Sequence, residues 1–307
     1  MVRTCEAAVI GYGSIGQRHK RILEELGCDV TVVSRRPLDG VQSAATFGEA
    51  VSRAMPDYVV VANETSAHGK TVEALLEMGF ANRLLVEKPL GAMPAAAFAA
   101  RFRVAAVGYN LRFHPVVRAL GGAVAGQKLV SAHAYCGQYL PDWRPGTDFR
   151  LSYSADPARG GGVLRDLSHE LDYLLWLFGP WHRVAATGGR LGTLDIASDD
   201  CWAILLELEH CPAVSLQLNY LDRPGRRHII VNTTTHTYCA DLVEGTLMRD
   251  GEAQAFAVQR DDTYRAQHLA ILRGETDRLC TLAQGRRVMQ LIEAIERAAL
   301  DKAWVCA

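Results

Sequence analysis

The fold of the first third of the chain is decided by the stretch Ala7-Ala8-Val9-Ile10-Gly11-Tyr12-Gly13-Ser14-Ile15-Gly16. Its apolar start is typical of a buried strand, and an amphipathic helical pattern follows directly after the third glycine. Gly11 permits a tight turn, Gly13 lets a phosphate approach the backbone, and Gly16 lets the helix pack closely on the strand. The amide groups of Ser14 and Ile15 are then available to phosphate oxygens at the helix N-terminus. In this setting the glycine spacing predicts a dinucleotide-binding turn.

The same rhythm of strand and helix continues to about residue 110. Apolar strand-like runs recur with helical segments between them, and Val59-Val60-Val61 is typical of a strand that is buried on both faces. We therefore predict an α/β domain over residues 1–110, a Rossmann domain with a doubly wound parallel sheet. Strands are expected at residues 7–10, 30–33, 58–62, 84–86 and 104–107, with a short helix within 92–102.

Beyond residue 110 strands follow strands with few helices between them. Val214, Leu216 and Leu218 face one way, while Ser215 and Gln217 face the other, as in a half-buried strand. We predict a second, α+β domain over residues 111–307, whose largely antiparallel open sheet leaves one face for dimerisation or tetramerisation. Strands are expected at 203–209, 214–220, 227–233, 236–242 and 253–258, and helices at 162–178, 263–273 and 286–300.

Composition favours a small-molecule partner. Lys plus Arg total 33 against 34 Asp plus Glu, so no basic field is expected for nucleic acid or for an anionic membrane surface. No run of about 18 apolar residues occurs, and the start of the chain does not read as a signal peptide, so we expect a cytoplasmic protein. The eight cysteines form no Cys-x-x-Cys pair and are expected to be reduced and structural.

The residues after the second strand bear on the choice of dinucleotide. A site selective for NAD places Asp or Glu there to bind the ribose 2'-hydroxyl, whereas this chain has Ser34, Arg35 and Arg36. A hydroxyl and two guanidinium groups suit a 2'-phosphate, and no carboxylate is there to repel it. We therefore expect NADP(H) as the cofactor, with NAD(H) and a merely solvated arginine loop as the alternatives.

Motifs further along the chain carry a family resemblance. Glu87-Lys88-Pro89 ends a strand, residues 108–113 mark the junction of the domains, and a triple-glycine turn at 160–162 leads to Asp166-Leu167-Ser168-His169-Glu170-Leu171-Asp172. With the first glycine turn, and in this order over nearly the whole chain, they resemble the Gfo/Idh/MocA family of glucose-fructose oxidoreductase and inositol dehydrogenase. The resemblance implies hydride transfer between a nicotinamide and a secondary alcohol or ketone of a sugar, nucleotide-sugar or cyclitol.

Lys88 is a candidate catalytic residue for two reasons, its place in the Glu87-Lys88-Pro89 motif and its position at the end of a strand. Oxidation of a secondary alcohol needs a base for the hydroxyl proton and a cation near the developing alkoxide. Lys88 can supply the cation or carry the proton, since it stands at the carboxyl end of a parallel strand, where ligands of open α/β sheets bind. A surface lysine is the alternative. The resemblance implies that Glu87 and Lys88 also border the cofactor.

The second catalytic candidate lies on the helix expected over residues 162–178. His169 and Asp172 are three residues apart on it and share a face with Asp166 and Tyr173. A histidine beside carboxylates suits proton exchange near neutrality. The resemblance implies that His169 is the catalytic histidine, acting with Lys88 as general acid/base, and that Asp166 or Asp172 orients it.

Two observations leave the roles of Asp166 and His169 on this helix open. The family's aspartate usually precedes the histidine by four residues, whereas Asp166 precedes His169 by three. Ordinary charges at a helix N-terminus are the alternative to a catalytic role. Because no second histidine or cysteine lies nearby, we expect no metal site.

Two further groups of residues are candidates for ligand binding. The family lines its cofactor pocket with a threonine and a histidine at a spacing similar to that of Thr65 and His68, and Asn63 precedes them. A surface helix position is the alternative for His68. At the domain junction, Asn110 and Arg112 are expected to contact the substrate.

The irregular connection over residues 138–153 is expected to bind the substrate, because long irregular segments in compact domains are commonly functional. Aromatic side chains there can stack on a sugar, and arginines can hold a phosphate or carboxylate. An ordered interdomain or dimer-contact loop is the alternative. The sequence of this segment is similar to that of family members found in surface-polysaccharide and sialic-acid-like sugar biosynthesis. The candidate residues are Tyr139, Trp143, Arg144, Arg150 and Tyr153.

Three functions remain open from the sequence. The first is an NAD(P)-dependent dehydrogenase or reductase acting on CH–OH groups. The second is a redox-neutral glycosidase or lyase that retains its nicotinamide, as some family members are known to do. The third is a non-catalytic dinucleotide-binding sensor, which the fold alone allows but the presence of both Lys88 and His169 argues against.

Overall fold

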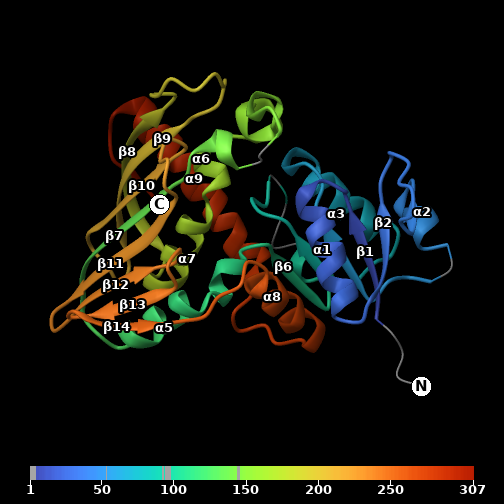
Figure 1. The fold of residues 1–307 in the computed structure, drawn as a ribbon, viewed down its shortest axis with the longest axis horizontal. Coiled ribbons are helices and arrows are strands. Elements are labelled where there is room, and N and C mark those ends of the chain that lie inside the picture. The colour runs from blue at the N-terminus through green and yellow to red at the C-terminus, as the bar shows by residue number, and fades with distance from the viewer. Residues whose placement is uncertain (1–4, 53, 92, 94–97, 144–145) are drawn as a thin grey trace. The chain divides into compact units, whose positions relative to one another are not determined.

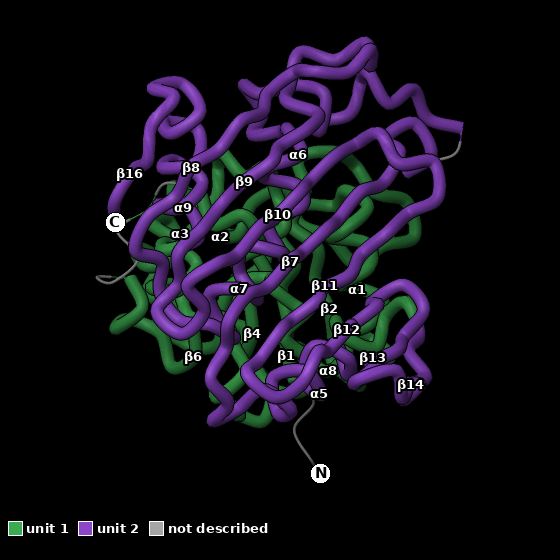
Figure 2. Tube along the Cα trace, turned by 90° about the vertical axis from the view of Figure 1, so that its left-hand side faces the viewer, with its two compact units in different colours: residues 1–113, 260–287 green, residues 114–259, 288–307 purple. Residues whose placement is uncertain are grey.

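The computed structural model describes residues 5–52, 54–91, 93, 98–143 and 146–307. The chain forms two compact units, shown in Figure 2. Unit 1 comprises residues 1–113 and 260–287, and unit 2 comprises residues 114–259 and 288–307. Unit 1 thus includes a segment that follows most of unit 2 in the sequence.

Unit 1 is built around a seven-stranded sheet in the order β15-β6-β5-β4-β1-β2-β3. Strands β1 to β6 are parallel to their neighbours, and β15 joins the edge antiparallel to β6. The order of the six parallel strands is that of a dinucleotide-binding Rossmann sheet, so the predicted doubly wound parallel sheet is confirmed. The strands are β1 (Glu6–Ile10), β2 (Asp29–Val33), β3 (Ser43–Ala44), β4 (Tyr58–Val61), β5 (Arg83–Val86), β6 (Val104–Val107) and β15 (Cys280–Thr281).

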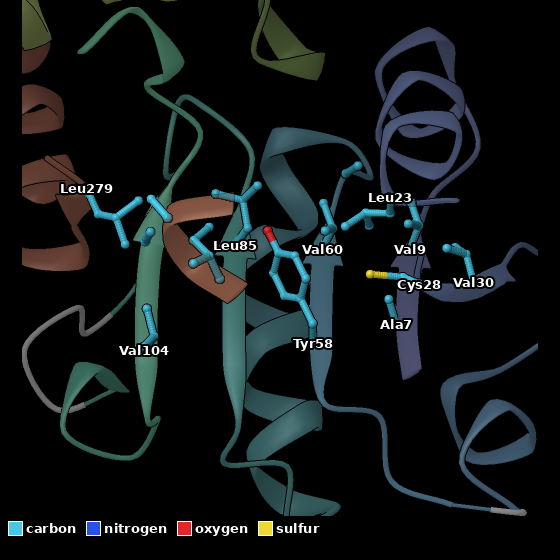
Figure 3. Close-up of a cluster of buried hydrophobic side chains, with 14 of the residues drawn as sticks. Ala7, Val9, Leu23, Cys28, Val30, Tyr58, Val60, Leu85, Val104 and Leu279 are labelled. Atoms are coloured by element: carbon cyan, nitrogen blue, oxygen red, sulfur yellow. The ribbon is translucent and has the colours of Figure 1, made fainter. Parts of the chain in front are cut away.

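The middle of this sheet is the core of unit 1. Every residue of β4 is buried, as its continuous β-branched sequence predicts. Val60 packs with Val9 of β1 and Leu85 of β5 in the cluster drawn in Figure 3. In the register of the sheet Ile10 pairs with Val61, and Val61 pairs with Val86. The carboxyl ends of these strands are therefore level, and the loops that follow them leave from one edge.

Helices and short 3-10 turns complete unit 1. Helix α1 (Ser14–Glu25) buries Ile22 and Leu23 and packs against β1 and β2 (Figure 1). The expected helix at 263–273 is present as α8 (Asp262–Arg273), and the one expected within 92–102 lies partly outside the described residues. The other elements are α2 (Phe47–Ala50), η1 (Thr65–Ala67), α3 (His68–Glu77) and η2 (Asn110–Phe113).

Unit 2 contains a nine-stranded sheet in the order β14-β13-β12-β11-β7-β10-β9-β8-β16. All neighbouring strands are antiparallel except β7 and β10, which are parallel, so the predicted largely antiparallel sheet is confirmed. The strands are β7 (Leu129–Gly137), β8 (Trp181–Gly189), β9 (Cys201–Leu208), β10 (Val214–Asn219), β11 (Arg226–Thr233), β12 (Thr237–Asp241), β13 (Thr246–Arg249), β14 (Glu252–Ala255) and β16 (Val305–Cys306).

The sheet of unit 2 has one covered face. Val214, Leu216 and Leu218 are buried, and Ser215 and Gln217 on the other face are half-buried, as their alternation predicts. Figure 1 shows α6 and α7 on the covered face, and α6 contacts β9 and β10. Four described strands of unit 2 have no counterpart in the sequence prediction, namely β7, β8, β13 and β16.

The helix predicted over 162–178 is wrong as a single element. The chain forms α6 (Val163–Asp166) and α7 (His169–Phe178), and Leu167 between them has φ −96° and ψ 25°, outside the helical range. Unit 2 also has α5 (Pro115–Val124), η3 (Leu140–Asp142), η4 (Phe149–Leu151), η5 (Tyr153–Ala155) and η6 (Pro157–Arg159), and α9 (Leu282–Asp301) runs from unit 1 into unit 2. Among the described helices, none has the length and apolar character to cross a membrane.

Candidate active site

The glycine turn has the geometry that its sequence predicts. Gly11 has φ +102°, and a Cβ there would lie 2.6 Å from the carbonyl oxygen of Ala62, so only glycine fits. A Cβ on Gly16 would overlap the carbonyl oxygen of Gly11. Gly13 is different, because a Cβ there would meet no atom within 4 Å. The backbone is thus open to a ligand at Gly13, at the point where α1 begins.

The first turn of α1 suits a phosphate group. Gly13 is the N-cap of the helix and provides no side-chain cap, and the first turn carries no acidic residue. The amide groups of Ser14 and Ile15 therefore keep the positive end of the helix dipole without a competing carboxylate on the helix. These residues fit the pyrophosphate of a dinucleotide.

The second strand brings its polar residues to the same edge. The Gly11 amide donates to the carbonyl oxygen of Val33 at 3.0 Å, so the glycine turn touches the end of β2. Ser34 follows directly, and its hydroxyl interacts locally with the backbone of Arg36. Arg35 and Arg36 are both exposed, which leaves their guanidinium groups available to a ligand.

The loop after β4 is tied to the loop after β5 by His68. This imidazole is 1% exposed, and its Nδ1 and Nε2 lie 3.2 Å from the carbonyl oxygens of Pro89 and Asn63. Burial lowers the pKa of His68, so the ring is neutral and donates one hydrogen bond at a time. His68 thus holds backbone in place, while Thr65 is half-buried in the same loop.

Glu87 and Lys88 follow β5 at this edge. The bond between Lys88 and Pro89 is cis, Lys88 is half-buried, and Glu87 is only 6% exposed. The backbone amide of Lys88 donates to Oε2 of Glu87 at 3.1 Å. A Cβ on Gly108 would lie 2.7 Å from Oε1 of Glu87, so this glycine makes room for the carboxylate.

Sequence reasoning missed three residues that belong to this centre. His19, His268 and Tyr58 form a buried hydrogen-bonded chain that ends on Glu87. One signal was present, since His19 lies on the buried face of α1 with Ile22 and Leu23. His268 lies far along the sequence, and only the tertiary structure pairs it with His19.

The two junction residues are engaged within unit 1. The Asn110 amide donates to Oγ1 of Thr263 at 2.6 Å. Arg112 is 2% exposed, and its Nη1 donates to Oε1 of Gln284 at 2.9 Å and to the carbonyl oxygen of Leu279 at 3.3 Å. Arg112 therefore fastens the 260–287 segment to the rest of unit 1.

In unit 2, Asp166 is held by two phenols. Tyr153 donates to its Oδ1 at 2.8 Å and Tyr220 donates to its Oδ2 at 2.6 Å. Burial, together with the neighbouring Asp166 carboxylate, raises the pKa of Tyr220, so this phenol stays protonated as a donor. Asp166 lies on α6 while His169 begins α7, so the carboxylate fastens the 138–153 segment to α6.

The N-terminal turn of α7 carries His169 and Asp172. His169 is half-buried and Asp172 is 1% exposed. Between them, Glu170 is fully buried and accepts a 2.7 Å hydrogen bond from Nε of Arg227 on β11. This ion pair fixes α7 on the sheet and thereby fixes the start of the helix on which His169 lies.

The candidate residues of the 138–153 segment differ in their contacts and in their exposure. The Arg223 guanidinium lies 3.6 Å from the ring centroid of Tyr139, so one face of that ring is covered. Trp143 packs edge-on against Tyr220 with centroids 5.2 Å apart. Arg150 is exposed and pairs with Asp148 at 2.6 Å. Arg144 lies outside the described residues.

The described residues contain no group of three or more His, Cys, Asp or Glu side chains arranged to hold a metal ion. The fit of a dinucleotide rests on the open backbone at Gly13 and the strand-end residues around it.

These features define unit 1 as a dinucleotide-binding Rossmann domain. Two family models match the sequence, the oxidoreductase family with an NAD-binding Rossmann fold over residues 5–106 and the GFO/IDH/MocA C-terminal domain over residues 124–239. The chain belongs to the Gfo/Idh/MocA family of oxidoreductases, which confirms the resemblance drawn from its motifs. No curated protein matches the chain.

Solved structures share the fold over almost the whole chain. Levoglucosan dehydrogenase in complex with NADH is 15% identical with a TM-score of 0.82, covering 99% of both chains. A protein of gentamicin A biosynthesis in complex with NAD is 22% identical with a TM-score of 0.82, covering 100% of this chain and 97% of that one. UDP-N-acetylglucosamine 3-dehydrogenase from Acidithiobacillus ferrooxidans is 19% identical with a TM-score of 0.78, covering 97% and 98%.

Proposed function

We propose that this protein is an NAD(P)-dependent dehydrogenase or reductase that transfers a hydride between a nicotinamide and a CH–OH carbon of a sugar, nucleotide-sugar or cyclitol. One observation carries the proposal. The glycine turn, the Ser34–Arg36 segment and Lys88 all follow the carboxyl ends of parallel strands in one sheet, where ligands of such sheets bind. The sugar and nucleotide-sugar dehydrogenases among the similar structures support this substrate class.

The catalytic groups in this proposal are Lys88 and His169. The nicotinamide accepts or supplies the hydride, Lys88 stabilises the developing alkoxide, and His169 exchanges the hydroxyl proton. Asp166 or Asp172 is proposed to orient His169; Asp172 lies with His169 on α7, and Asp166 also accepts hydrogen bonds from two phenols.

The choice of dinucleotide is a further part of the proposal. NADP(H) is favoured over NAD(H), because β2 ends in Ser34 and two exposed arginines without a carboxylate for the ribose hydroxyl. Thr65 and Asn63 in the loop after β4 are proposed to border the same cofactor.

Trp143 and Tyr153 are the proposed substrate contacts in unit 2. Both lie on the 138–153 segment, which Asp166 fastens to α6.

We also propose that the protein forms a homodimer or homotetramer through the open face of the nine-stranded sheet. A cytoplasmic location is proposed as well, and it suits the eight free cysteines. A sugar of surface-polysaccharide biosynthesis is the narrower substrate that the sequence favours.

A ligand screen followed by kinetics tests the function. A panel of NADP, NAD, sugars and nucleotide-sugars is scanned by thermal shift, because a ligand that binds only the folded state raises the melting temperature. Stabilising sugars are then assayed for net NADPH formation or consumption. Lys88→Ala and His169→Ala should each lower kcat about 100-fold or more while the cofactor still binds. Product release with no net change in the cofactor would instead indicate the redox-neutral enzyme, and a Lys88→Ala variant with full function would indicate a sensor.

A further inference from the structure

Two free cysteines of unit 1 lie side by side where β1 and β2 begin. Cys5 directly precedes β1, and Cys28 directly precedes β2. Glu6 pairs with Asp29 in the parallel register, and the amide of Asp29 donates to the carbonyl oxygen of Cys5 at 2.9 Å. Neighbouring strands lie about 4.8 Å apart, and the two Cα atoms of a disulfide are usually about 4.4–6.8 Å apart. The backbone at Cys5 and Cys28 therefore suits a disulfide.

Both thiols lie on the same face of the sheet. Side chains alternate along a strand, so Cys5 shares a face with Ala7, and Cys28 shares a face with Val30. Ala7, Cys28 and Val30 belong to the buried cluster drawn in Figure 3, and Cys5 packs against that cluster. The side chains of Cys5 and Cys28 are hydrogen-bonded to each other. A bond between their sulfur atoms therefore needs a side-chain rotation and no change in the pairing of the strands.

The turn after α1 fixes the position of Cys28. Gly27 has φ +86°, and its amide donates to the carbonyl oxygen of Glu24 at 2.9 Å. The amide of Cys28 donates to the carbonyl oxygen of Leu23 at 3.0 Å. These two bonds form the Schellman motif that ends many helices, and the side chains of Cys28 and Leu23 pack in the same cluster. The Cys28 thiol is thus held next to Cys5 by the way the helix ends.

The two thiols differ in reactivity. Cys5 is half-buried, whereas Cys28 is only 7% exposed. The hydrogen bond from the Cys28 thiol lowers the pKa of Cys5 below its usual value, although burial and the Asp57 carboxylate oppose this effect. The hydrogen bond with Cys5, together with burial, raises the pKa of Cys28. Because the thiolate is the reactive form of cysteine, an oxidant reacts first with Cys5.

We propose that Cys5 and Cys28 are a modification site at which hydrogen peroxide forms a reversible disulfide. The Cys5 thiolate attacks the peroxide, so that an S–O bond forms, the O–O bond breaks and one water leaves with the thiol proton. The Cys28 sulfur then attacks the sulfenic acid of Cys5, so that the S–S bond forms, the S–O bond breaks and a second water leaves. Two thiols are oxidised, and one peroxide is reduced to two waters. A small dithiol reverses the bond by thiol–disulfide exchange.

This bond joins the two ends of the dinucleotide-binding unit. Residues 5–28 contain all of β1, the glycine turn and α1. A cross-link around this segment restricts the unfolded chain and so stabilises the folded one. The bond lies at the amino ends of β1 and β2, whereas the glycine turn follows the carboxyl end of β1. The oxidised protein should therefore keep its affinity for a dinucleotide, and the inference is independent of the proposed function.

The test uses the folded, full-length wild-type protein. It is treated with hydrogen peroxide, alkylated, digested without reductant and analysed by mass spectrometry. Trypsin cuts at Arg18 and Arg21, so the peptides of Cys5 and Cys28 should appear cross-linked and should separate again in dithiothreitol. Cys201 is the internal control, because it is also half-buried but burial raises its pKa. The thiol of Cys5 should be lost about tenfold faster than that of Cys201.

Variants separate the roles of the two thiols. Cys28→Ala removes the second sulfur, so Cys5 should accumulate as a sulfenic acid that dimedone traps, and then as a sulfinic acid that dithiothreitol does not reduce. Cys5→Ala leaves a buried thiol alone, and oxidation of Cys28 should slow about tenfold. Cys211→Ala is the matched control, since Cys211 is a buried cysteine of unit 2 at 0% exposure. It should leave the disulfide unchanged.

The wild-type protein alone can overturn the inference, even if Cys28→Ala does not fold. Equal rates at Cys5 and Cys201 would do so, as would a sulfinic acid at Cys5 beside a reduced Cys28, or a disulfide that joins two copies of the chain. The oxidised protein should melt about 5 °C above the reduced one. A lower melting temperature would contradict a bond that fits the paired strands.

The affinity for NADPH, followed by its fluorescence, should agree within about twofold between the oxidised and reduced forms. A loss of affinity on oxidation alone would contradict the placement of the bond away from the glycine turn. If the disulfide forms as expected but neither form binds a dinucleotide, the proposed function fails and the modification site stands.

Discussion

Gly16 lies directly against Gly11, so closely that a Cβ on Gly16 would overlap the carbonyl oxygen of Gly11. This contact joins the first turn of α1 to the end of β1. It determines how near the helix N-terminus comes to the strand edge where a dinucleotide binds. Gly13, between them, has open space around it.

Gly16→Ala should destabilise unit 1. The added methyl group meets backbone, which cannot move aside as a side chain does, and the free energy of unfolding should fall by about 2 kcal/mol or more. Urea unfolding followed by circular dichroism measures this. Gly13→Ala is the control, because its φ of −78° suits alanine. It should unfold like the wild type but bind NADPH about tenfold more weakly, since its methyl group would occupy the pyrophosphate position. Equal stability of the two variants would contradict this packing argument.

Arg35→Ala should raise the KM for NADPH about tenfold and leave the KM for NADH within about twofold. The exposed guanidinium is available to the 2'-phosphate, which NADH lacks. Initial rates at a saturating concentration of the sugar measure both constants. Arg249→Ala, at an exposed arginine of unit 2, is the control and should change neither. Equal effects on both cofactors would remove the assignment of Arg35 to the phosphate.

Stability should fall on acidification in part because of His114. Burial, with the nearby charge of Arg227, lowers the pKa of His114 to about 4. Between the unfolded value of about 6.5 and that value, the unfolded chain binds a proton that the folded chain does not, so stability decreases as pH falls through this window. His114→Gln should reduce the loss of unfolding free energy between pH 7.5 and pH 5 by about 1–2 kcal/mol.

Urea titrations at the two pH values measure this difference. His182→Gln, at an exposed histidine, serves as the comparison and should retain the wild-type loss. A His114→Gln variant with the same pH dependence as the wild type would show that this imidazole is protonated equally in the folded and unfolded states.

Tyr153→Phe should raise the KM for the sugar about three- to tenfold, with little change in NADPH affinity. The lost hydroxyl is one of the two donors to Asp166 that fasten the 138–153 segment to α6, and one hydrogen bond to a charged group contributes about 1.5 kcal/mol or more. Tyr238→Phe removes a hydroxyl that accepts from Gln127 elsewhere in unit 2. The proposed role of the segment would be lost if both variants had the same KM.

Much of unit 1 could be predicted from local sequence. The glycine spacing and the continuous apolar runs located β1, β2, β4, β5 and β6 to within about one residue, because strands buried on both faces have an unbroken apolar pattern. In unit 2, β10 alternates cleanly and was predicted. Strand β7 was not, since Ala132 and Ala134 on its buried face give a weak apolar alternation.

The candidate site divides in the same way. The sequence located Lys88 and His169 by motif, and it located the helix around His169 but not the break at Leu167, since an amphipathic pattern continues through a one-residue departure from helical geometry. It left open whether Asp166 or Asp172 orients His169, and the hydrogen bonds from Tyr153 and Tyr220 to Asp166 emerge only from the structure. Tyr220 lies 54 residues away, and no local pattern links the two.

By itself the sequence determined the class of fold, the dinucleotide turn and the motif lysine, because these depend on periodicity and on residues within a few positions of one another. Only the tertiary structure decided which buried polar groups meet, as His19, His268 and Glu87 do from three distant segments. The physical reason is that a buried polar atom must find its hydrogen-bond partner wherever packing brings one, and sequence separation places no limit on that choice.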